Sequence, residues 1–60
     1  MIEFLVNQII NGTVILGKPF TYSDAIAIIN RDVPEDRRDS TIDELNNVLL
    51  LRGHVDLIKK

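Results

Sequence analysis

Apolar residues recur at helical spacing in three stretches of this chain, and this periodicity limits most strongly how it can fold. In the first stretch they follow the i, i+3, i+4, i+7, i+8 pattern of an amphipathic helix, with polar residues on the other side. These apolar positions are Ile2, Leu5, Val6, Ile9 and Ile10. Because a glycine after such a stripe commonly ends a helix, we expect this one to stop near Asn11, before Gly12.

A second amphipathic helix is predicted over about residues 21–31. Thr21 or Ser23 can cap its N-terminus, and the charge of Asp24 in the first turn suits the helix dipole. The stripe expected to be buried consists of Tyr22, Ala25, Ile26 and Ile29.

A third helix is predicted over about residues 41–52, after a loop. Residues 30–40 are almost wholly polar, and Pro34 disfavours a helical residue before it, so this stretch predicts the loop. Thr41 and Glu44 then match a capping box. The apolar stripe that follows consists of Ile42, Leu45, Val48 and Leu49, and Gly53 is expected to close the helix.

Two short strands complete the predicted fold. Residues 13–16 are rich in β-branched side chains between two glycines, and Val55 and Leu57 alternate with polar residues. We expect these two segments to pair. The prediction is a single domain over residues 1–60 of the mainly α class, a three-helix domain with a small two-stranded β ribbon in the order α-β-α-α-β.

The composition argues against several function classes. Sixty residues without cysteine exclude a disulfide or a thiolate zinc site, and a chain this short hides only about 60% of the surface that its unfolded form exposes. Enzymatic activity is therefore not expected, and neither is a cofactor. His54 has no second histidine or cysteine to share a metal, so no metal ligand is expected. The net charge of −2 argues against binding to phosphates by bulk positive charge.

The predicted location is the cytoplasm. Absence of cysteine suits a reducing compartment. Glu3 stands where a signal peptide would carry a basic residue, and no apolar run approaches the roughly 18 residues of a membrane span. We therefore expect neither export nor membrane insertion.

The order of these features resembles a compact winged helix-turn-helix domain that ends after its second strand. The resemblance rests on the turn at residues 17–20 with the capped helix behind it, on residues 39–42 opening the third helix, and on residues 45–51 followed by Arg52-Gly53-His54-Val55. The chain departs from that family in a long loop at residues 32–39 and in a missing third wing strand. The resemblance implies DNA binding and regulation of transcription. A fainter resemblance, through Val33-Pro34-Glu35, is to short phage-encoded proteins.

DNA binding through the third helix is the most concrete function predicted. Asp43, Asn46, Asn47 and Leu50 are expected on its outward face. An asparagine amide can bond bidentately to adenine, so the two asparagines are the candidate base readers. The full set of candidate nucleic-acid contacts is Arg37, Arg38, Thr41, Asn46 and Asn47.

Binding to another protein is the alternative function, as an adaptor or inhibitor of phage, viral or plasmid type. Leu50 and Leu51 extend the apolar run around more than one helical face, and Phe4 lies off the main stripe of the first helix. These three residues are the candidate interface. A second copy of the chain could cover them, since small domains without disulfides or structural metals gain stability by association. A homodimer is therefore expected. The C-terminal strand folding over Leu50 would serve equally.

Overall fold

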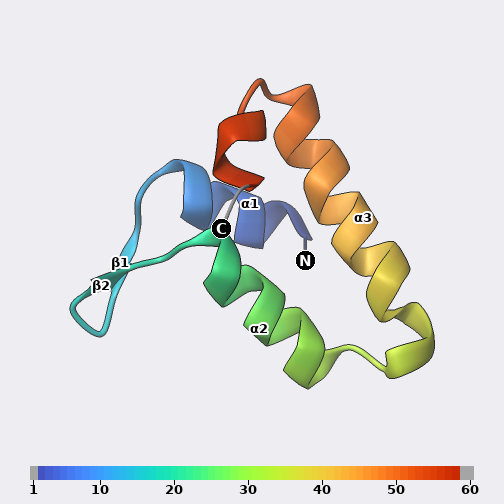
Figure 1. Cartoon of the computed structure of the whole chain (residues 1–60). Coiled ribbons are helices and arrows are strands. Elements are labelled where there is room, and N and C mark those ends of the chain that lie inside the picture. Colours follow the sequence, from blue (N-terminus) through green and yellow to red (C-terminus); the bar gives the residue numbers. More distant parts are fainter. Residues whose placement is uncertain (1, 59–60) are drawn as a thin grey trace.

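Three helices, one short β-hairpin and a C-terminal 3-10 turn make up the computed structural model, which describes residues 2–58 (Figure 1). The elements are α1 (Ile2–Ile10), β1 (Val14–Ile15), β2 (Lys18–Pro19), α2 (Tyr22–Asp32), α3 (Glu35–Leu51) and η1 (Val55–Ile58). The predicted mainly α class is confirmed. The element order α-β-β-α-α, followed by the 3-10 turn, differs from the predicted α-β-α-α-β.

Helix α1 ends where its sequence predicts. Gly12 adopts a left-handed φ of 65°, and its amide donates to the carbonyl of Ile9 at 3.2 Å. The amide of Thr13 donates to the carbonyl of Gln8 at 3.1 Å. This pair of bonds is a Schellman motif, which satisfies carbonyls that the last turn leaves free and turns the chain away from the helix axis.

Thr21 begins α2 through a capping box, which confirms it as one of the two predicted caps. Its hydroxyl accepts from the amide of Asp24 at 3.3 Å, and the Asp24 carboxylate accepts from the amide of Thr21 at 3.0 Å. The carboxylate also lies at the positive end of the helix dipole. The polar caps therefore fix the start of α2 without any tertiary contact.

Helix α3 begins six residues earlier than predicted, and the predicted loop is wrong. Only Val33 and Pro34 separate α2 from α3. Val33 is extended, the conformation that a following proline favours, and Pro34 is the N-cap of α3. Glu35 and Asp36 then stabilise the first turn through the helix dipole. The sequence of these first turns resembles a loop because they contribute no apolar side chain to the core. Their exposed residues are Glu35, Asp36, Arg37, Asp39 and Ser40.

The predicted capping box at the start of this helix is consequently wrong. Thr41 lies inside α3, and its hydroxyl donates to the carbonyl of Arg37 at 2.8 Å. A threonine within a helix commonly bonds the carbonyl four residues before it. Glu44 also lies within α3 and is exposed.

The two predicted strands do not pair with each other. Within the described residues, β1 pairs antiparallel with β2, so that Val14 faces Pro19 and Ile15 faces Lys18. Leu16 and Gly17 form the connecting turn, and both have positive φ, at 55° and 80°. A two-residue turn with positive φ at both positions matches the right-handed twist of a hairpin. Local turn geometry therefore overrides the longer-range pairing.

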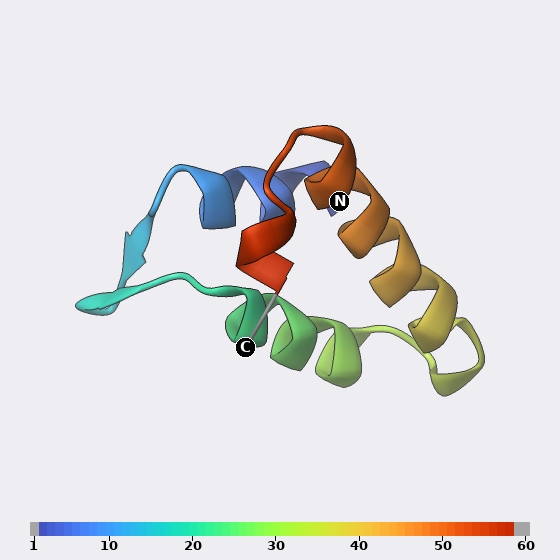
Figure 2. The ribbon, with the colours of Figure 1, turned by 45° about the horizontal axis from the view of Figure 1, so that its top comes forward.

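The C-terminal segment is a 3-10 turn, so the predicted strand there is wrong. Gly53 ends α3 in a second Schellman motif, with its amide on Leu50 and that of His54 on Leu49, at 3.0 and 2.9 Å. The chain then folds back toward the other helices (Figure 2). Leu57 packs against the core. Alternation over four residues predicts a strand poorly when no partner strand lies nearby.

The predicted helical stripes meet in one core between α1, α2 and α3. Its buried side chains among the described residues are Ile2, Leu5, Val6, Ile9, Phe20, Ala25, Ile29, Leu45 and Leu49. Phe20 is the member that helical periodicity could not predict, because it follows the hairpin. It anchors the return of the hairpin to the helices, aided by its amide, which donates to the carbonyl of Thr13 at 2.7 Å.

Replacing Leu45 by alanine should unfold much of the population. Leu45 is fully buried, and truncating such a leucine costs about 2–5 kcal/mol, which is comparable to the whole stability of a domain of this size. Urea denaturation followed by circular dichroism measures the loss. Leu51→Ala is the matched control on the same helix and should change the free energy of unfolding by no more than about 0.5 kcal/mol. Equal effects of the two substitutions would contradict the observed core.

Candidate interaction surfaces

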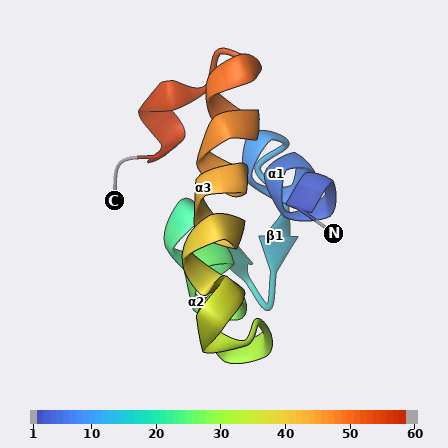
Figure 3. The ribbon, with the colours of Figure 1, turned by 90° about the vertical axis from the view of Figure 1, so that its right-hand side faces the viewer.

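Helix α3 runs along one side of the molecule, with α1 and α2 against it (Figure 3). Its inner face carries Leu45 and Leu49, which are fully buried. Asp36, Asp43 and Asn47 are spaced by seven and four residues, so they lie on one outward face, and all three are exposed. This outward face is the surface on which the predicted DNA readers were expected.

Asn46 does not lie free on the outward face. It is half-buried, and its Oδ1 accepts from the hydroxyl of Tyr22 at 2.5 Å. Tyr22 stands at the start of α2, so this bond joins the two helices. At 100° per residue, Asn46 lies on α3 at the border between the core face and solvent. From this position its side chain can reach α2. Asn47 is exposed, as predicted.

The predicted phosphate-binding residues divide in the same way. Arg37 is exposed. Arg38 is half-buried and donates from Nη2 to the carbonyl of Val33 at 3.0 Å, while its Nε finds no hydrogen-bond partner within residues 2–58. The Thr41 hydroxyl is engaged with the carbonyl of Arg37. Of the five candidate nucleic-acid residues, only Arg37 and Asn47 are exposed.

Carboxylates dominate the outward side of α3. Asp39 is exposed and lies beside Asp36 and Asp43 on the helix surface, and Glu35 and Glu44 are also exposed. At neutral pH this side of the helix is strongly acidic. A phosphate backbone approaching it would meet like charge.

Two other cations are paired with groups of the protein itself. Arg52 donates from Nη1 to Asn7 Oδ1 at 2.7 Å and from Nη2 to Glu3 Oε1 at 3.0 Å, which ties the end of α3 to α1. Arg31 bonds Asp32 at 3.1 Å. That hydrogen bond lowers the pKa of Asp32 and raises that of Arg31. Neither arginine is directed toward the acidic face of α3.

The three predicted interface residues are all exposed. The exposed fractions are 62% for Phe4, 55% for Leu50 and 85% for Leu51. The C-terminal turn does not cover Leu50, so that alternative is not realised within the described residues. Val55, just beyond the end of α3, is also exposed, at 53%. The C-terminal end of α3 therefore presents several apolar side chains together.

A second apolar surface, on the hairpin, was missed by the sequence reasoning. Val14, Ile15 and Leu16 are exposed there, and a recess of about 390 Å³ lies between the hairpin and α2. The apolar run at residues 13–16 is predicted from the sequence as a strand that pairs with the C-terminal segment. The signal that could have revealed the hairpin is the glycine in a short turn between two extended pairs of residues.

Neither a metal centre nor a membrane span is found in the part of the chain that the structure describes. No three histidine or acidic side chains among residues 2–58 gather as metal ligands. None of the described helices has the length and apolar character that crossing a bilayer requires.

Comparison with known protein families, curated proteins and solved structures finds no match to this chain. The resemblance to winged helix-turn-helix domains thus stays a prediction. The connection between α2 and α3 is short, contrary to the long loop expected from the sequence, and no wing strand follows α3 within the described residues.

Replacing Tyr22 by phenylalanine should lower the free energy of unfolding by about 1 kcal/mol. The substitution keeps the ring and removes the donor to Asn46, a half-buried acceptor. Urea denaturation of Tyr22→Phe, Asn46→Ala and the double variant measures the coupling between the two side chains. Purely additive effects would show that the hydrogen bond contributes nothing to stability.

Proposed function

We propose that this chain is a small regulatory binding protein, without catalytic activity, that acts by contacting another protein through the outer side and C-terminal end of α3. The observation that carries the proposal is the exposure of Leu50 and Leu51 at the end of a helix whose outward side is acidic. Apolar side chains gathered on a small domain are typical of interaction sites.

The charge pattern favours a protein over DNA as the partner. DNA binding gains most of its affinity from cations placed against phosphates. On α3, Arg38 is turned toward Val33, while Asp36, Asp39 and Asp43 are exposed. Asn46, one of the two candidate base readers, is engaged with Tyr22. A duplex docked on this helix would therefore lose electrostatic energy that the remaining Arg37 alone does not restore.

The same pattern describes the partner. Leu50 and Leu51 need an apolar pocket, and Asp43, two turns before Leu50, needs lysine or arginine at its edge. A partner surface with an apolar centre and a basic rim would fit the two leucines and the carboxylate. Charge at the rim should govern the association rate, and the leucines should govern the lifetime of the complex.

Titration with random duplex DNA separates the two functions. At about 50 mM salt, where non-specific binding is strong, we expect no change in the fluorescence polarisation of a labelled duplex at tens of micromolar protein. Binding that weakens steeply with salt, and that Arg37→Ala reduces for all sequences alike, would instead support DNA binding.

Leu50→Asp should abolish binding to the partner while the fold persists. The immobilised protein captures candidates from an extract of the source cells, and each candidate is purified and titrated against the wild-type chain. We expect the dissociation constant to rise more than tenfold with Leu50→Asp, because a charge would enter an apolar contact. Ser23→Asp is the matched control, since it adds the same charge at an exposed position in the first turn of α2, away from the proposed surface, and should leave the dissociation constant unchanged. A purified partner that binds the Leu50→Asp variant as tightly as the wild type would refute the proposal.

A further inference from the structure

The hairpin tip exposes a large apolar side chain in an unfavourable backbone conformation. The hairpin projects away from the three helices (Figure 1). Leu16, in its turn, is 97% exposed and has a φ of 55°, a region where glycine and asparagine are usual. Neither feature stabilises the isolated chain. A strained and exposed residue of this kind points to a contact that the isolated chain does not make.

A recess lies directly beside the tip. It has a volume of about 390 Å³, and its walls are formed by the hairpin and by one face of α2. The apolar lining residues are Ile15, Leu16, Phe20, Ala27 and Ile28. One surface thus holds both an apolar protrusion and an apolar hollow.

We infer that this surface is an interface between two copies of the chain, with Leu16 of each copy seated in the recess of the other. A two-fold interface uses the same patch on both subunits, so the patch must fit itself. A protrusion adjacent to a hollow meets this requirement, since the two-fold axis brings each protrusion over the opposite hollow. The left-handed turn sets Leu16 at the end of the hairpin, where it can reach across.

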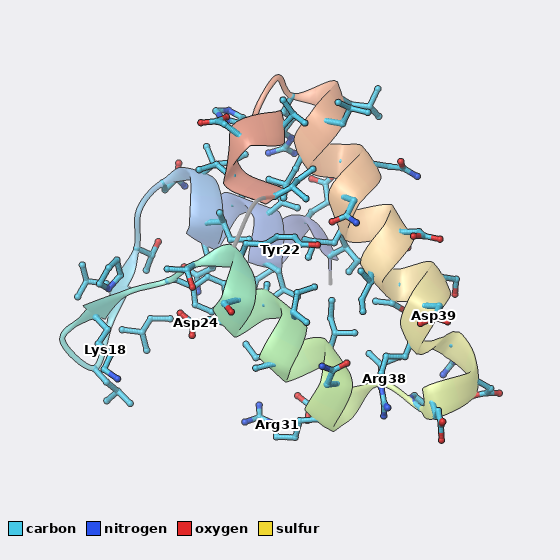
Figure 4. All side chains as sticks on the ribbon, viewed as in Figure 1. Lys18, Tyr22, Asp24, Arg31, Arg38 and Asp39 are labelled. Atoms are coloured by element: carbon cyan, nitrogen blue, oxygen red, sulfur yellow. The ribbon has the colours of Figure 1, made fainter. Side chains whose placement is uncertain are left out.

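The charges around the recess permit this self-association. Lys18, Asp24 and Arg31 line it, and Asp32 is bonded to Arg31 (Figure 4). The lining therefore carries two cations and one anion, and Asp32, outside the lining, pairs with one of the cations, so a second copy brings charges of both signs to the recess. The acidic outward side of α3 would repel its own copy. Of the two exposed apolar surfaces, the hairpin is accordingly the one suited to a second copy.

The size of the patch predicts a weak dimer. The exposed parts of Val14, Ile15 and Leu16 together amount to about two complete aliphatic side chains per copy. Standard interfaces bury roughly 800 Å² on each partner, which is more than this patch and its rim supply. We expect a dissociation constant on the order of 0.1 mM. The inference concerns a different surface from the proposed function, so either can fail alone.

Leu16→Asn tests the interface without endangering the fold. Asparagine tolerates the left-handed turn better than leucine, so the monomer should be as stable as the wild type or more so. Sedimentation equilibrium from about 10 µM to 1 mM should show a monomer–dimer equilibrium for the wild type. The dissociation constant should rise at least tenfold for Leu16→Asn. Ala27→Glu, which fills the recess from the α2 side with a good helix former, should have the same effect.

Leu51→Asn is the matched control, since it makes the same change at an exposed leucine on the other surface. It should leave the dimer unchanged. A wild-type chain that is monomeric at 1 mM would overturn the inference. So would a dimer that Leu16→Asn leaves intact, or one that Leu51→Asn disrupts equally, because association would then use another surface.

Discussion

The burial of Leu45 and Leu49 on α3 is the interaction on which the rest of the structure depends. They are one turn apart and fully buried. Val6 of α1 and Ile29 of α2 are fully buried as well and belong to the same core. No disulfide can support this core, because the chain has no cysteine. The inner apolar stripes of the three helices therefore pack against one another, and apolar residues outside those stripes, such as Leu50 and Leu51, stay at the surface.

Polar contacts between helices set the orientation of α3 and thereby decide which of its side chains can serve a partner. The Tyr22–Asn46 hydrogen bond joins α2 to the middle of α3, and Arg52 joins the end of α3 to α1 through Glu3. These bonds are small contributions to stability, since the groups remain partly or largely solvated. They also occupy polar groups that an isolated helix would present to solvent.

Two apolar surfaces remain, and they differ in charge. The end of α3 combines Leu50 and Leu51 with a row of carboxylates, which suits a basic partner and opposes a second copy of the chain. The hairpin combines Leu16 with a recess whose lining carries charges of both signs. A small domain with two such faces could hold a partner on one and associate through the other, so that weak self-association would present two partner-binding ends at once.

The sequence by itself determined the helical class, the inner stripes and the local ends of the helices. Periodic apolar residues, the Thr21–Asp24 cap and the glycine at Gly12 act within one or two turns, and their physics is local. Tertiary structure decided the rest. It joined Asn46 to Tyr22 of α2, brought Phe20 into the core, and left residues 14–16 uncovered. These outcomes depend on which helix packs against which, and the spacing of residues along a chain does not contain that information.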